Sequence, residues 1–142
     1  MPQITYNVAM SLDGFIAPPD ESSSWIVADE SIDFNALYDR FDVFIMGRKT
    51  FDAIAEAGEY NLLRGMAKDR VFVISRTLKA EDHPEVTIVR DDYMELLREW
   101  KTQGDKHVWV MGGGWLAGDC LSAGILTSIE VAIVPVILGN GF

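Results

Sequence analysis

Short apolar runs that alternate with predicted helices restrict the fold of this chain more than any other feature of its sequence. The runs at 42–47 (DVFIMG), 70–75 (RVFVIS) and 107–111 (HVWVM) are apolar at their inner positions, as expected for short buried strands. The segment at 91–104 has an acidic start and a glycine stop, so it is predicted to be a helix. Strands that alternate with helices are typical of an α/β domain with a largely parallel sheet.

The other predicted elements follow the same rules. Strands are expected at 4–10, where alternate residues share one face, and at 86–90. After the first strand, a helix with Ser31 as its N-cap is expected, because the apolar positions have the spacing of one helix face: Phe34, Leu37, Tyr38 and Phe41. Two more helices are predicted, one over 49–58 that ends at Gly58 and one over 115–123 that is followed by Gly124.

Composition places the chain in one class of protein and excludes others. With 142 residues, of which 49% are hydrophobic, it is expected to form a single domain over residues 1–142. A formal net charge of −10 argues against nucleic acid as a partner, since phosphates need a basic surface. No apolar run is long enough to span a membrane and the N-terminus lacks a signal peptide's pattern, so a cytoplasmic protein without a membrane partner is expected. Cys120 is the only cysteine, and no metal site is predicted.

Three junctions that follow predicted strands carry residues suited to phosphate. The first junction is Gly47-Arg48-Lys49-Thr50, and the second is Ser75-Arg76-Thr77. The third consists of Gly112, Gly113 and Gly114, whose bare backbone amides lie at a predicted helix start, where the macrodipole favours an anion. In parallel sheets, ligands bind at the carboxyl ends of the strands. Together the three junctions predict a ligand with several phosphates, such as a dinucleotide.

Each junction also has a plainer interpretation. GRKT is not the end of a P-loop, because Arg48 stands where that motif needs a glycine before the lysine. GGGWLA fits the loose pattern G-x-G-x-x-A with Glu130 beyond it, yet the standard dinucleotide fingerprint opens its fold and this one comes late. The glycines alone could form a plain turn, and Arg76 alone could be a solvated surface arginine. The coincidence of all three junctions favours a ligand.

Five segments taken together resemble the dihydrofolate reductase-like fold: SLDGFIA, FIMGRKTFDAI, VFVISRT, VWVMGGGWLAGDCL and VAIVPVILGNGF. They are most similar to the C-terminal reductase domain of the bifunctional riboflavin-biosynthesis deaminase–reductase. The resemblance spans nearly the whole chain. It implies a three-layer α/β/α domain with a mostly parallel central sheet, whose C-terminal strands are missing here, because the chain ends at Phe142 where members of the family usually continue.

The resemblance also implies NADPH as hydride donor and assigns residues to it. Arg48, Lys49 and Thr50, which follow Gly47, match the family's phosphate-contacting turn, and Ser75 and Arg76 match its site for the adenosine 2′-phosphate. The pyrophosphate cradle is matched by Gly112, Gly113, Gly114, Trp115 and Leu116. Ile16 and Ala17 match the loop that lies against the nicotinamide. On this interpretation the three glycines let a pyrophosphate approach the backbone amides.

Two carboxylates are candidates for the chemistry. Glu30 follows Trp25 by five positions and precedes Phe34 by four, which are the spacings of the substrate-binding carboxylate in dihydrofolate reductases. It could bind an amino-pyrimidine edge and help to deliver a proton. Its alternative is an acidic residue at a helix start. Asp13 matches the family's S-x-D-G turn near the nicotinamide, and its alternative is an ordinary Asp-Gly turn.

The function expected from these matches is an NADPH-dependent reductase that transfers a hydride to a small heterocyclic substrate. That substrate would be pteridine- or pyrimidine-like, for example 5-amino-6-(5-phosphoribosylamino)uracil. No basic cluster is clearly reserved for a substrate phosphate or a glutamate tail. The alternatives are a non-catalytic module that binds NADPH or another nucleotide, and a structural subunit that binds no cofactor.

The last predicted strand, Ile129 to Leu138, is apolar on both faces and is therefore expected to be buried in the sheet. In the related fold, later strands cover its outer edge. Here we expect the backbone donors and acceptors of that edge to face solvent. Long apolar edges invite pairing with another chain. We therefore expect either a homodimer that covers this region or a chain that lacks its native ending.

Overall fold

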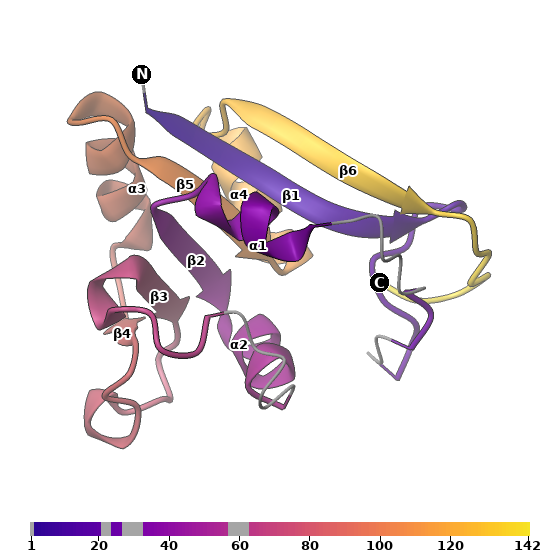
Figure 1. Ribbon diagram of the computed structural model, residues 1–142, viewed down its shortest axis with the longest axis horizontal. Coiled ribbons are helices and arrows are strands. Elements are labelled where there is room, and N and C mark those ends of the chain that lie inside the picture. The colour runs from indigo at the N-terminus through magenta and orange to yellow at the C-terminus, as the bar shows by residue number, and fades with distance from the viewer. Residues whose placement is uncertain (1, 21–23, 27–32, 57–62) are drawn as a thin grey trace.

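A computed structural model describes residues 2–20, 24–26, 33–56 and 63–142. Within them, six strands form one sheet in the order β4-β3-β2-β5-β1-β6 (Figure 1). Their bounds are β1 Gln3–Ser11, β2 Val43–Gly47, β3 Val71–Ile74, β4 Thr87–Val89, β5 His107–Gly112 and β6 Ser128–Val134. Every neighbouring pair of strands is parallel, which confirms the α/β class and the parallel sheet.

Helices cover both faces of this sheet, so the predicted three layers are confirmed. The helices are α1 Phe34–Asp39, α2 Arg48–Ala55, α3 Tyr93–Thr102 and α4 Gly114–Ser122, with short 3-10 turns at Lys68–Arg70 and Ala80–Asp82. Figure 1 shows α1 in front of the sheet and α4 behind it. No helix in the described ranges is long and apolar enough to cross a membrane.

Alternation along β2 explains how one strand serves two cores. Val43 and Ile45 belong to the core beneath α3 and α4, whereas Phe44 and Met46 belong to the core beneath α1 and α2. All four side chains are at most 1% exposed. A strand that is apolar on both faces can be buried only where both faces are covered, which is why this pattern correctly predicts a central strand.

Helix boundaries differ from the predictions by a few residues. The N-cap of α1 is Asp33, not Ser31, because its carboxylate accepts a hydrogen bond from the N–H of Ala36 at 3.0 Å. α2 ends at Ala55, before the predicted stop at Gly58, a residue outside the described ranges. α4 begins one residue earlier than predicted, at Gly114.

The prediction that the last strand is buried from Ile129 to Leu138 is wrong. β6 ends at Val134, because the next residue, Pro135, has no N–H for the ladder. β6 pairs with β1 on one side, and no other strand of the described residues pairs with it. Ile129, Val131 and Ile133 are 52%, 43% and 60% exposed. The strand is apolar and lies at an open edge of the sheet among the described residues, as predicted, but its side chains are exposed and not buried.

The homodimer stays a prediction, and this edge is where it can be tested. We expect Val131→Lys to prevent edge-to-edge pairing of two β6 strands. The charged lysine in the middle of β6 would have to lie against the apolar β6 strand of the second copy. Sedimentation at several concentrations should show a dimer for the wild type and a monomer for the variant. Gln103→Lys, at an exposed position beyond α3, controls for the added charge. A wild-type chain that sediments as a monomer at every concentration would contradict the prediction.

Candidate functional site

Four neighbouring strands end at the segments that the sequence assigns to a cofactor. β3, β2, β5 and β1 are adjacent in this order and parallel, so their carboxyl ends share one edge of the sheet. β3 leads to residues 75–77, β2 to residues 48–50, β5 to the glycine turn at 112–114, and β1 to the loop at 12–17. The structure therefore brings the predicted cofactor segments together along one strip, at the edge where parallel sheets bind ligands.

The glycine turn, residues 112–114, lies at the centre of this strip and is close to its neighbours. A Cβ atom on Gly47 would lie 3.7 Å from the backbone nitrogen of Gly113. A Cβ atom on Gly112 would lie 3.7 Å from Oγ1 of Thr50, and one on Gly114 would lie 4.0 Å from Cδ1 of Ile16. The turn after β5 therefore adjoins both α2 and the loop that follows β1.

Gly112 and Gly113 differ in whether their backbone conformation requires glycine. Gly112 has a φ of +123°, a conformation that residues with a side chain rarely adopt. Gly113 has φ −77° and ψ −165°, which any residue can adopt, and apart from its chain neighbours no described residue would lie within 4 Å of a Cβ atom there. The fold of the chain therefore accounts for Gly112 but leaves open space above Gly113.

Two helices begin at this edge without a side chain that caps them. The N-cap residues are Gly47 for α2 and Gly113 for α4, and neither helix has a side-chain cap. In α4, the N–H of Ala117 donates to the carbonyl of Gly113 at 3.2 Å, so the N–H groups of residues 114–116 precede the helical ladder. Uncapped N–H groups and the positive ends of two helix dipoles favour an anion here.

Trp115 and Leu116 differ in what they can offer a ligand. The Leu116 side chain is 7% exposed and belongs to the core beneath α3 and α4, so only its backbone can face the edge. Trp115 is 90% exposed in the first turn of α4. An indole in this position can report a ligand at the glycine turn by its fluorescence.

The turn after β3, residues 75–77, carries two hydroxyl groups and one arginine, and a second arginine contacts it from α2. Nη1 of Arg48 donates to Oγ1 of Thr77 at 3.1 Å, which joins the start of α2 to this turn. Oγ of Ser75 accepts hydrogen bonds from the N–H groups of Thr77 and Leu78, at 3.2 and 3.0 Å. Ser75 therefore shapes the turn. Arg76 is 82% exposed and lies 3.4 Å from an Asp91 carboxylate oxygen.

Arg90 is a further cation of this region that the sequence analysis did not select. It follows β4, the strand next to β3, and its Nη2 donates to the carbonyl of Arg76 at 3.0 Å. The signal was present in the sequence, because Arg90 ends the predicted strand at 86–90 just as Arg76 follows the strand before it.

Asp13 is held in a dense set of hydrogen bonds. Its carboxylate accepts from the hydroxyl of Ser11 at 2.7 Å and from the N–H groups of Leu138 and Gly139 at 3.1 and 2.7 Å. These bonds, led by the one from Ser11, lower the pKa of Asp13 below its ordinary value. The stabilisation is therefore present at neutral pH and is lost only as the pH falls through that lowered pKa. A carboxylate in this state is ionised at neutral pH, so a proton-donor role for Asp13 is not favoured.

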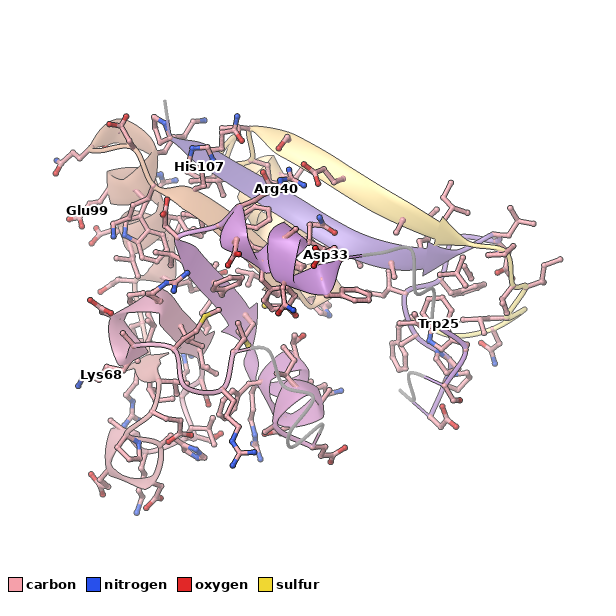
Figure 2. The ribbon with its side chains drawn as sticks, in the orientation of Figure 1. Trp25, Asp33, Arg40, Lys68, Glu99 and His107 are labelled. Atoms are coloured by element: carbon pink, nitrogen blue, oxygen red, sulfur yellow. The ribbon has the colours of Figure 1, made fainter. Side chains whose placement is uncertain are left out.

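Two further acidic residues considered in the sequence are Glu30 and Glu130. Glu30 lies outside the described residues, so its role stays a prediction. Asp33 and Arg40 lie at the two ends of α1 (Figure 2). Arg40 binds both carboxylate oxygens of Glu130, at 2.6 and 3.2 Å, and Asn7 donates to the same carboxylate at 3.0 Å. The hydrogen bond from Arg40 lowers the pKa of Glu130. Glu130 therefore ties the end of α1 to β6.

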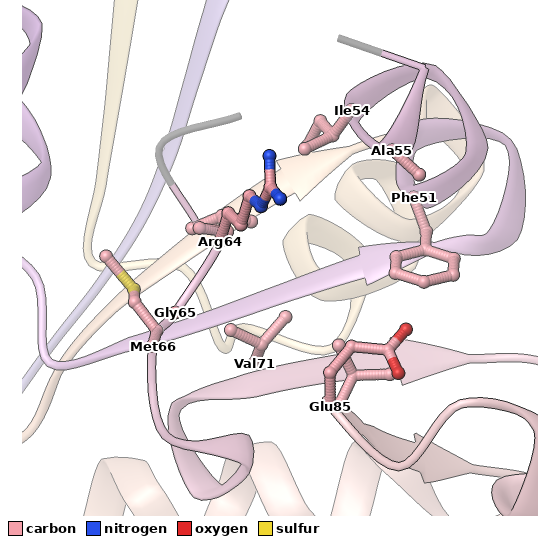
Figure 3. A pocket seen from close by; sticks show the side chains of 10 residues that line it. Phe51, Ile54, Ala55, Arg64, Gly65, Met66, Val71 and Glu85 are labelled. Atoms are coloured by element: carbon pink, nitrogen blue, oxygen red, sulfur yellow. The ribbon is translucent and has the colours of Figure 1, made fainter. Parts of the chain in front are cut away.

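A hollow of about 410 Å³ lies elsewhere, beside α2 and the start of β3 (Figure 3). Its apolar lining includes Phe51, Ile54, Val71 and Val86, with Arg64 and Glu85 as charged residues. None of the described residues predicted to bind cofactor lines it. It is therefore distinct from the strip at the carboxyl ends of the strands.

Comparison with protein families and curated proteins gives a consistent relationship. The family model of the RibD C-terminal domain matches residues 2–142. The uncharacterized protein YyaP of Bacillus subtilis is 26% identical, over 98% of this chain and 78% of its own length. The riboflavin biosynthesis protein RibD of Mycobacterium tuberculosis is 28% identical over 99% of this chain, which spans 44% of that relative.

Solved structures agree on the fold. A protein from Shewanella sp. PV-4, described as a putative riboflavin biosynthesis protein, superimposes with a TM-score of 0.77 at 23% identity, over 98% of this chain and 80% of its own. A deaminase/5-amino-6-(5-phosphoribosylamino)uracil reductase from Thermotoga maritima superimposes with a TM-score of 0.69 at 19% identity. That match covers 99% of this chain and 47% of the Thermotoga chain.

Proposed function

This chain belongs to the RibD C-terminal domain family, and from that premise we propose that it is an NADPH-dependent reductase of a small, pyrimidine- or pteridine-like heterocycle. The observation that carries the proposal is the strip at the carboxyl ends of β3, β2, β5 and β1. Every described residue that the sequence assigns to the cofactor belongs to a segment that begins at this edge. The family supplies the reductase class, and the strip supplies the residues.

The residues of the strip suit the parts of NADPH. The open space above Gly113 and the uncapped starts of α2 and α4 suit the pyrophosphate. Arg76 lies in the turn at 75–77, and Arg48 donates a hydrogen bond to Thr77 of the same turn. Both arginines would contact phosphates of the cofactor, and Arg76 would bind the adenosine 2′-phosphate. Ile16, next to Gly114, would lie beside the nicotinamide end. Along the edge, the arginines therefore lie at the β3 and β2 end, the backbone donors of the glycine turn follow at β5, and the apolar side chain of Ile16 follows at β1.

When bound, NADPH supplies a hydride, and this chain must orient the substrate and handle one proton. The backbone amides of the glycine turn and the arginines fix the position of the cofactor. Since the Asp13 carboxylate already accepts three hydrogen bonds, Glu30 is the remaining candidate for binding the heterocycle and, once it is protonated, for delivering a proton to it.

A turnover screen tests the proposed reductase activity. NADPH oxidation should be followed with 5-amino-6-(5-phosphoribosylamino)uracil, dihydrofolate and simple carbonyl compounds. We expect a heterocycle of the first two types to be reduced. If NADPH binds and none of the compounds is reduced, the non-catalytic module replaces the reductase. If NADPH does not bind at all, both proposals fail.

Glu30→Gln should separate substrate chemistry from cofactor binding. The substitution keeps the size of the side chain but replaces the titratable carboxyl group with an amide, which cannot carry the charge or transfer the proton. We expect turnover of the reduced heterocycle to fall by about a hundredfold or more, with an altered pH profile. The dissociation constant of NADPH should stay within about twofold of the wild type. Asp29→Asn is the matched control, and an unchanged rate for Glu30→Gln would leave Glu30 as a helix-start carboxylate.

A further inference from the structure

Asp13 joins two segments that are far apart in the sequence. It lies in the loop at 12–17, directly after β1, whereas its partners Leu138 and Gly139 lie in the segment at 136–142, after β6. The two segments lie side by side in Figure 1, where the chain turns back after β6. The N–H of Leu12 also donates to the carbonyl of Val136 at 2.8 Å. One carboxylate therefore collects donors from both segments.

The same two segments also meet through their backbones at a second place. The N–H of Ile16 donates to the carbonyl of Phe142 at 2.7 Å, and the N–H of Phe142 donates to the carbonyl of Ala17 at 2.8 Å. Between these contacts, Gly141 has a φ of +147° and approaches the Ala17 carbonyl so closely that a Cβ atom there would collide with it. The loop that carries Ile16 and Ala17 is therefore fastened at both of its ends to residues 136–142.

Inside the loop, Asp13 also fixes the local conformation. Oγ of Ser11 donates to Asp13 and accepts from the N–H of Phe15 at 2.9 Å, and Ser11 is fully buried. A chain of hydrogen bonds thus runs from Phe15 through Ser11 to Asp13 and on to the N–H groups of Leu138 and Gly139. Asp13 is the only member of this chain that touches both segments.

We propose that Asp13 is a positioning residue: its bonds to the N–H groups of Leu138 and Gly139, here called the latch, fasten the loop at 12–17 to the segment at 136–142. Through the latch, the C-terminal segment sets the position of Ile16 beside the glycine turn. The link to the nicotinamide rests on the proposed function, whereas the latch itself rests on the hydrogen bonds. An ionised carboxylate suits this task because it accepts bonds only and can accept several at once.

Hydrogen–deuterium exchange without NADPH tests the latch directly. In Asp13→Ala, we expect the amides of residues 136–142 and 12–17 to exchange faster by about tenfold or more, while exchange in α3 stays unchanged. Asp13→Asn keeps one acceptor oxygen and should give an intermediate result. Glu99→Ala, an exposed carboxylate on α3, is the control for lost charge. Unchanged exchange at Leu138 and Gly139 in Asp13→Ala would overturn the latch.

A second readout separates positioning from a general effect on stability. In the wild type, NADPH should slow exchange in residues 12–17 and also in 136–142, because the latch transmits the restraint. In Asp13→Ala, NADPH should still slow exchange in residues 12–17 but no longer in 136–142. A variant in which both segments remain protected by NADPH would contradict the positioning role. If NADPH protects neither segment of the wild type, the proposed function fails, and the exchange without NADPH decides on the latch alone.

Gly141→Ala disrupts the same junction without a change of charge. Its Cβ would collide with the Ala17 carbonyl and lie 3.1 Å from Cα of Pro18, so the two segments must separate. We expect the amides of residues 12–17 and 136–142 to exchange faster than in the wild type, as in Asp13→Ala. Gly104→Ala, at another glycine with positive φ but with nothing within 4 Å of its Cβ, controls for backbone strain alone. Faster exchange confined to one of the two segments in Gly141→Ala would count against their coupling.

Discussion

Gly113→Val is expected to weaken NADPH binding by about a hundredfold or more while the protein remains folded. The valine side chain would enter the open space above the glycine turn, where no described residue beyond the chain neighbours lies within 4 Å of a Cβ atom on Gly113. The backbone of Gly113 already has an extended conformation that valine can adopt. The loss should therefore come from contact with the pyrophosphate and not from damage to the fold.

Titration of the Trp115 fluorescence with NADPH measures this effect, and thermal melting checks the fold. Gly118→Val is the matched control, because Gly118 lies on the same helix and its Cβ would also meet nothing within 4 Å. Gly114→Ala offers a milder change, since its Cβ would make only ordinary contact with Ile16. Normal NADPH binding by a folded Gly113→Val protein would show that the turn is purely structural.

Arg76→Ala should weaken NADPH binding by about 10- to 150-fold and leave NADH binding nearly unchanged. Hydrogen bonds to a charged group contribute roughly 1.5–3 kcal/mol, which converts to this range. Among the described residues, Arg76 forms an ion pair with Asp91, and this pair is weak because both side chains are exposed. The guanidinium is therefore available to a 2′-phosphate, the group that NADH lacks.

The two cofactors should be titrated in parallel at the same ionic strength, because exposed charges are screened by salt. Arg98→Ala, on the exposed side of α3, controls for the loss of one positive charge. The assignment of the 2′-phosphate to Arg76 would be abandoned if the substitution weakened NADPH and NADH equally.

The central strands could be predicted because their sequence signal is local. β2 is apolar on both faces, and such a run is stable only inside a covered sheet, so neither register nor partner had to be known. β6 has a similar apolar pattern, yet its side chains are exposed, and Ile133 is 60% exposed. The pattern reports an apolar strand but not its place in the sheet, which depends on pairing with β1.

For the candidate site too, the local motifs could be predicted from the sequence, whereas their surroundings could not. The glycine turn was visible as a motif, but only the backbone angles and the surrounding space separate the structural Gly112 from the open Gly113. The partners of Asp13 lie 125 and 126 residues away, so no local pattern could predict them. Asp33 and Ser31 are both capable caps, and the choice depends on where α1 begins, which packing decides.

The central claim is that the strip at the carboxyl ends of the strands binds NADPH, and equilibrium titration of the wild-type protein with NADPH and NADH tests it most directly. The account predicts saturable quenching of protein fluorescence by NADPH, with an affinity at least about tenfold higher than for NADH. Replacing Trp115 with phenylalanine should remove much of the signal without abolishing binding. No saturable binding of NADPH, or equal affinity for the two cofactors, would contradict the account.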